Sequence, residues 1–140
     1  MISSFFKNLM FQAKKDPSLY SINSQYSLII EKLRNEMDEG LISCQISRRS
    51  TNVILASFNS QETMTPLFHK ITSFIEHALI ASSFPRLKNS YKIFLKNDIV
   101  ILTFLIKDIQ LNIVANYSQV NIGLIEQITI PEILENLKEI

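Results

Sequence analysis

The chain has 140 residues, of which 46% are hydrophobic and 19% charged, and its formal net charge is +1. That length suits one domain with its own core. The near-neutral charge gives no reason to expect a nucleic-acid partner, because such domains usually carry a concentrated basic patch. No run reaches the roughly 18 apolar residues of a transmembrane helix. Cys44 is the single cysteine, which fits a reducing compartment, so we expect a cytoplasmic protein.

Residues 1–18 are predicted to form an amphipathic helical extension ahead of a single domain over residues 19–140. Lysines occupy its polar side and Pro17 ends it, because proline disfavours helix at the preceding residue. A basic amphipathic helix can bind a membrane surface, here through residues 1–15. Packing on protein is favoured, because apolar stripes usually face cores. The apolar positions recur at three- and four-residue spacing and are Ile2, Phe5, Phe6, Leu9, Met10 and Ala13.

A second helix is expected from an N-cap at Ser21 or Asn23 to Gly40, where glycine would tolerate a left-handed C-cap. The apolar period then changes from 3.6 to 2, which indicates β-structure. Residues 42–47 read as a strand, with Cys44 on its apolar face. The polar residues 48–52 read as a hairpin loop, and residues 53–58 as the returning strand.

The longest predicted helix starts at a capping box formed by Asn59 and Glu62, or at Thr65 before Pro66, and ends near Phe84. Its apolar stripe is wide enough to face two surfaces at once. The residues of this stripe are Leu67, Phe68, Ile71, Phe74, Ile75, Ala78 and Leu79.

Three strands separated by tight turns follow, over residues 91–95, 99–106 and 109–117, and such turns require antiparallel pairing. Residues 99–106 are almost all apolar, as expected of a central strand covered on both faces. The tail is predicted to be helical, with a capping box at Thr129 and Glu132. The fold class is therefore α+β, in the order α-α-β-β-α-β-β-β-α.

Side chains that could carry chemistry do not form a recognisable active site, so we expect a protein that is not an enzyme and uses no cofactor or metal. His69 and His77 stand eight residues apart on one predicted helix, about 12 Å, too far for one metal ion. They are interpreted as solvent-edge histidines. Cys44 is interpreted as core filler, because an apolar setting suppresses the thiolate. With two glycines in the chain, no phosphate-binding glycine-rich loop is possible.

The element order from Leu41 to Ile140, preceded by a packing helix, resembles the roadblock/dynein light-chain family. The last predicted strand and the segment after it read "IQLNIVANYSQVNIGLI" over residues 109–125. Members of that family end in a similar way, with a strand, a small loop and a helix carrying Asn-x-Gly. The long helix and the strand that follows it match in position. Many members have an Asp-Gly turn between the first two strands, where this sequence has Arg48-Arg49-Ser50-Thr51-Asn52.

The resemblance implies a five-stranded antiparallel sheet, a roadblock/profilin-like sandwich, and a homodimer that regulates or scaffolds a small Ras-like GTPase. An apolar edge strand also needs something to pair with it. Arg48 and Arg49 are candidate partner contacts, because arginine is enriched at interfaces. The expected dimer contacts are Phe68, Ile71, Ile75, Leu79, Tyr91, Ile93 and Leu95.

Two other functions fit the residues. A dimeric secretion-type chaperone, which holds unfolded client segments, has a similar element count, although such proteins are usually more acidic. A membrane-surface protein would act through residues 1–15.

Overall fold

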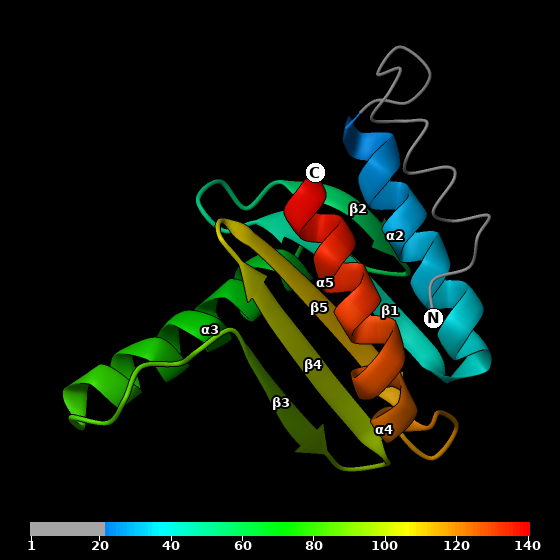
Figure 1. The fold of residues 1–140 in the computed structure, drawn as a ribbon. Helices are drawn as coiled ribbons and strands as arrows, with labels where there is room; N and C mark the ends of the chain where they lie inside the picture. The colour runs from blue at the N-terminus through cyan, green and yellow to red at the C-terminus, as the bar shows by residue number, and fades with distance from the viewer. Residues whose placement is uncertain (1–21) are drawn as a thin grey trace.

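The computed structural model describes residues 22–140 (Figure 1). The predicted extension over residues 1–18, with its membrane-contact segment, lies outside them. Within the described range, no helix is long and apolar enough to cross a membrane. The elements are α2 (Ile22–Met37), a 3₁₀ turn (Asp38–Gly40), β1 (Leu41–Arg48), β2 (Ile54–Phe58), α3 (Met64–Ala81), β3 (Ser90–Leu95), β4 (Ile99–Ile106), β5 (Ile109–Asn116), α4 (Ile122–Leu124), a π-helical turn (Ile125–Thr129) and α5 (Ile130–Glu139).

The five strands form one antiparallel sheet in the order β2-β1-β5-β4-β3. This confirms the predicted α+β fold, the first hairpin and the three-strand meander. The expectation that residues 99–106 form the central strand is wrong. β1 pairs with β5, which places β5 in the middle and β4 beside it. An apolar run indicates an interior strand, but its neighbours depend on a long-range pairing that the run does not encode.

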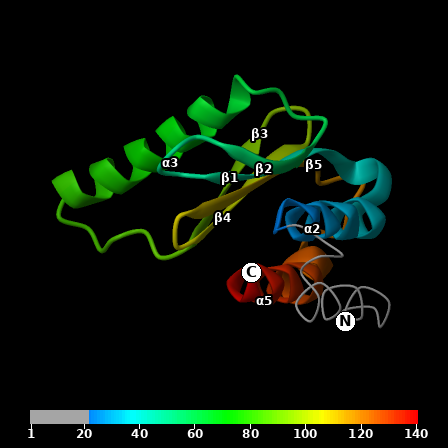
Figure 2. The ribbon, with the colours of Figure 1, turned by 90° about the horizontal axis from the view of Figure 1, so that it is seen from above.

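Helices cover both faces of the sheet (Figure 2). α2 and α5 lie on one face and α3 on the other, which gives three layers. The apolar core lies between the sheet and the α2/α5 layer, where Leu33, Ile113 and Ile133 are fully buried. Burying each such side chain contributes roughly 1.5–3 kcal/mol. Cys44 belongs to this core, and burial raises its thiol pKa to about 12, which confirms its interpretation as filler.

Gly40 does not provide the predicted left-handed C-cap. Asp38 adopts the left-handed conformation, with φ of 49°, and no glycine of the described chain has positive φ. Gly40 is instead required by a close approach. A Cβ atom there would lie 2.1 Å from Val120 Cγ1 and 3.3 Å from the backbone of Gln119. The glycine therefore lets the segment after β5 pack against the start of β1.

Of the two predicted starts of the longest helix, the capping box at Asn59 is wrong, and Thr65 lies one residue after the observed start. α3 begins at Met64, and its N-cap Thr63 makes no side-chain cap bond. The candidate cap Asn59 has φ of 51° and its Nδ2 donates 2.9 Å to the carbonyl of Ile42. A bond to β1 therefore replaces the local capping bond. The helix ends at Ala81, because Ser83 turns the chain with φ of 60°.

A capping box at Thr129 and Glu132 is likewise absent, because Thr129 lies inside a helical segment that runs from Ile122 to Glu139. The cap is Asn121, whose Oδ1 accepts from the Leu124 N–H at 3.1 Å. The asparagine of the Asn-x-Gly sequence therefore starts the C-terminal helix about two turns earlier than the capping box predicted.

Candidate protein-interaction surface

The sheet face beneath α3 is polar. Side chains from four neighbouring strands stand in register across it: Gln45 opposite Asn112, Asn112 opposite Thr103, and Thr103 opposite Tyr91. The first three are buried and Tyr91 is half-buried. The opposite face of the same strands carries the apolar core. The sheet thus presents an apolar surface to α2 and α5 and a hydrogen-bonding surface to α3.

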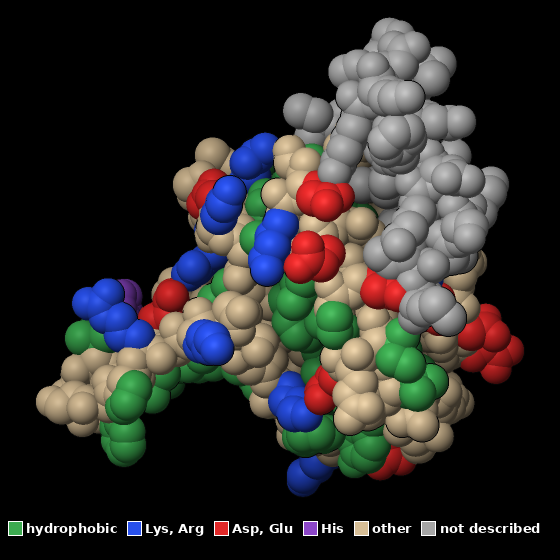
Figure 3. Space-filling view, in the orientation of Figure 1, with side chains coloured by type: hydrophobic (Ala, Val, Ile, Leu, Met, Phe, Trp, Pro, Cys, Tyr) green, Lys and Arg blue, Asp and Glu red, His purple; other side chains and the backbone are tan. Residues whose placement is uncertain are grey.

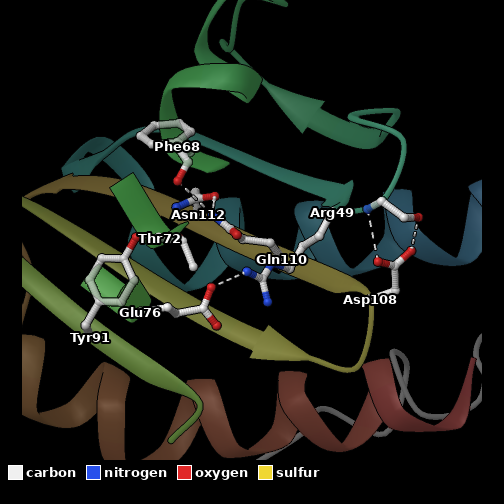
Figure 4. A network of polar contacts seen from close by, with 9 residues as sticks. Arg49, Phe68, Thr72, Glu76, Tyr91, Asp108, Gln110 and Asn112 are labelled. Atoms are coloured by element: carbon white, nitrogen blue, oxygen red, sulfur yellow. Dashed lines mark hydrogen bonds and ion pairs between the residues drawn. The ribbon is translucent and has the colours of Figure 1, made fainter. Parts of the chain in front are cut away.

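α3 is attached to this polar layer by directional bonds (Figure 4). Gln110 Nε2 donates 3.4 Å to the carbonyl of Phe68. One turn earlier on the helix, Thr65 donates 3.0 Å to Gln45 Oε1. One turn after Phe68, the hydroxyls of Thr72 and Tyr91 lie 2.7 Å apart. Each such bond contributes about 1 kcal/mol net. Because they need specific donors and acceptors, they fix the rotation of α3 about its axis.

Within the layer, Gln110 Nε2 donates 2.9 Å to Asn112 Oδ1, and Asn112 Nδ2 donates 2.8 Å to Thr103 Oγ1. Two buried atoms of the layer, Gln45 Nε2 and Gln110 Oε1, have no hydrogen-bond partner among residues 22–140. Leaving a buried polar atom unpaired costs about 1–3 kcal/mol. The layer is therefore a poor source of stability, which comes mainly from the apolar face.

The hairpin loop after β1 reaches α3 through an ion pair. Arg49 Nη2 lies 2.6 Å from Glu76 Oε1, and both side chains are partly exposed (Figure 4). Asp108 holds the same loop by accepting bonds from the backbone N–H and hydroxyl of Ser50. Of the two arginines predicted to contact a partner, Arg49 thus braces α3 within the protomer. The half-buried Arg48 beside it makes no ion pair with any residue of the described chain.

His69 joins α3 to the hairpin, so its interpretation as a solvent-edge histidine is wrong. Its Nε2 lies 2.8 Å from Ser47 Oγ, and its Nδ1 lies 2.5 Å from Asn52 Oδ1. These two hydrogen bonds suit a neutral imidazole ring, whose Nδ1–H donates to Asn52 while Nε2 accepts from Ser47. Burial, and secondly the charge of Arg49, lower the pKa of His69 below its ordinary 6.5. His77 is exposed, as predicted.

The lowered pKa of His69 predicts a loss of stability in mild acid. As the pH falls through 6.5, the unfolded chain takes up the proton before the folded chain does, so the free energy of unfolding decreases. We expect the urea midpoint to drop more between about pH 7.5 and about pH 5.5 in wild type than in a His69→Gln variant. Equal drops in the two proteins would contradict this assignment.

One side of α3 carries an apolar row that its own sheet does not cover. The row, here called the α3 stripe, repeats at alternating spacings of four and three, which is the pattern of helix-to-helix packing. Phe74 is 75% exposed and Leu67 is 53% exposed. Hydrophobic side chains accordingly stand on the protruding end of α3, clear of the rest of the molecule (Figure 3). The α3 stripe comprises Leu67, Ile71, Phe74, Ala78 and Ala81.

The predicted dimer contacts are distributed between the protomer interior and this surface. Phe68 is buried beneath α3, while Ile71, Ile75 and Leu79 are half-buried. On β3, Tyr91 and Ile93 are half-buried and Leu95 is 45% exposed. Leu67, Phe74 and Phe94 were not among the predicted contacts, although they are the more exposed apolar side chains of the two elements. For Leu67 and Phe74 the signal in the sequence was the unusual width of the apolar stripe predicted for the long helix.

β3 is an edge strand that lies beneath the path of α3. It pairs with β4 on one side and with no other strand of the described chain. The C-terminal half of α3 reaches past this edge (Figures 1 and 2). An open strand edge and an uncovered apolar stripe therefore lie side by side, which is the arrangement of an interaction surface.

No known family profile matches the sequence, and no curated protein matches it. Solved structures do match its fold. Myxococcus xanthus MglB superposes with a TM-score of 0.70 at 6% identity, over 86% of this chain and 90% of that one. A structure described as MglB with a tetrameric arrangement gives 0.63 at 11%, over 86% and 93%. The Roadblock/LC7 domain from Streptomyces avermitilis gives 0.57 at 9%, over 71% and 84%.

Proposed function

We propose that this chain, which has the fold of roadblock-type domains, is a non-catalytic homodimer that regulates or scaffolds a small Ras-like GTPase. The observation that carries the proposal is the α3 stripe beside the unpaired β3 edge. Roadblock-family members dimerise by pairing this strand and packing these helices, and one similar structure is described as tetrameric. The likeness of fold to MglB supports a GTPase partner for this chain.

The surface has the chemistry of a self-association interface. A two-fold dimer brings the same patch together from both copies, so it must be complementary to itself. An apolar helical row and an open strand edge both meet that requirement, because each can pair with a copy of itself. Arg48 is the proposed GTPase contact, since the neighbouring Arg49 is engaged with Glu76.

The test uses the full chain and each small Ras-like GTPase encoded in the same genome, beginning with any encoded in a neighbouring gene. Calorimetric titration with the GDP-bound form and with a form holding a non-hydrolysable GTP analogue should yield a dissociation constant in about the micromolar range for one GTPase. The expected complex contains two copies of this chain. Failure of every such GTPase to bind in either nucleotide state would reject the proposal. Recovery of a disordered client by pull-down would then support the chaperone alternative.

A further inference from the structure

The backbone groups that β3 leaves open can be identified from its pairing with β4. The N–H of Leu105 donates 2.8 Å to the carbonyl of Asn89, so these two residues form a hydrogen-bonded pair. Bonded and non-bonded pairs alternate along an antiparallel ladder. Tyr91, Ile93 and Leu95 are therefore bonded to β4. The N–H and C=O groups of the remaining three residues point away from the sheet; these residues are Ser90, Lys92 and Phe94.

We propose that a second copy pairs with this edge antiparallel, with the two-fold axis at Lys92, and that Glu126 makes that register possible by neutralising the lysine. The proposal rests on the homodimer proposed above and specifies its geometry. With the axis at Lys92, Ser90 faces Phe94 of the partner subunit and Lys92 faces its own copy. All three open residues then pair, whereas an axis at Tyr91 or Ile93 pairs two of them.

This register sets two lysines directly opposite each other. Residues in a bonded antiparallel pair have Cβ atoms about 5 Å apart, and like charges at that position destabilise the pairing. Tyr91 contacts Thr72 of α3, so Lys92, the next residue, projects from the opposite face, towards α5. Both lysines would therefore stand on one face of the joined sheet.

Glu126 removes that repulsion. Its Oε1 lies 2.8 Å from Lys92 Nζ, and it is carried by the π-helical turn between α4 and α5. The pair lines a groove of about 490 Å³ between β3 and α5. In the protomer the two side chains are 45% and 32% exposed, so the pair contributes little to stability there. Two neutral pairs, rather than two bare charges, then meet at the axis.

The shape of the protomer favours a second copy as the occupant of this edge. The C-terminal half of α3 extends beyond β3 (Figure 1), so it would overlie the sheet of a copy paired there. The α3 stripe would then be covered by the same association that closes the strand edge. One contact thus buries both features that the protomer leaves open.

Cysteine cross-linking measures the register. We would make S90C, Y91C, K92C, I93C and F94C singly and oxidise each with copper phenanthroline in air, which removes two electrons and two protons per disulfide. The native Cys44 is 1% exposed, and the wild-type protein controls for it. At the axis the two Cα atoms lie about 5.5 Å apart, within the range of a disulfide. At Phe94 they lie about 13 Å apart, which is too far.

We expect covalent dimers from K92C and none from F94C or S90C. Cross-linking by Y91C or I93C in place of K92C would overturn the Lys92 register while leaving the homodimer intact. If the wild-type chain sediments as a monomer at about 100 μM and no variant cross-links, the homodimer itself fails.

The role of Glu126 is tested separately by the dimer dissociation constant. E126Q should raise it about fivefold, and the K92Q/E126Q double variant should return it close to wild type. High salt, about 0.5 M, should reduce the effect of E126Q. If E126Q and the double variant have equal dissociation constants, Glu126 does not act through Lys92.

Discussion

Replacing Phe74 with glutamate is expected to raise the dissociation constant of the dimer by at least about 100-fold, which corresponds to about 2.8 kcal/mol. The side chain is 75% exposed in the protomer, so its aromatic surface is available to a partner. A charge placed there would be buried twice in a symmetric dimer. Sedimentation equilibrium gives the dissociation constant directly.

His77→Glu is the matched control for this prediction. His77 is exposed on the same helix three residues further on, and it lies outside the α3 stripe. Both variants should keep the free energy of unfolding of the protomer within about 0.5 kcal/mol of wild type, because neither touches the core. Equal dissociation constants for the two variants would show that the α3 stripe takes no part in association.

Gly40→Ala is expected to destabilise the protomer by about 1–3 kcal/mol, the range for forced overpacking. The new methyl group would collide with Val120 Cγ1 at 2.1 Å and press on the Gln119 backbone at 3.3 Å. The valine side chain is branched at Cβ and has few alternative rotamers. Urea denaturation of the variant and of wild type measures the difference.

The other glycine provides the comparison. A Cβ at Gly123 would meet Asn121 Oδ1 at 3.5 Å, an ordinary contact, so Gly123→Ala should be neutral or stabilising by up to about 1 kcal/mol. Adding Val120→Ala to Gly40→Ala should recover part of the lost stability. The explanation by steric contact is wrong if Gly40→Ala behaves like Gly123→Ala.

The sequence predicted most of the fold because its periodicity matches the way each strand is buried. In β1, Cys44 and Ile46 face the core, so alternation alone identified the strand. Alternation could not show that Gln45 and Ser47, on the other side, are also buried under α3. Polar residues on one strand face usually indicate solvent. The bonds that bury them, such as that from Thr65 to Gln45, join residues twenty positions apart.

The same hidden layer explains why the interaction surface was predicted only in part. Phe68 and Phe74 both belong to the wide apolar pattern that the sequence shows over residues 67–79, and sequence gives no reason to prefer either as an outward contact. The rotation of the helix decides between them, and polar contacts at Thr65 and Thr72 set that rotation. The start of α3 was misplaced for a related reason, since the Asn59 side chain bonds to the distant carbonyl of Ile42. The start of the C-terminal helix was misplaced because Asn121, an ordinary N-cap, bonds the N–H of Leu124 ahead of the predicted capping box.

The polar layer beneath α3 also separates two evolutionary pressures on this chain. Stability resides on the α2/α5 face of the sheet, where substitutions are constrained by close packing. The orientation of α3 is set on the opposite face by hydrogen bonds of the polar layer. These bonds do not involve the side chains on the outward side of the helix. The outward row from Leu67 to Ala81 can therefore diverge, and recognition with it, while the folding of the protomer is left undisturbed.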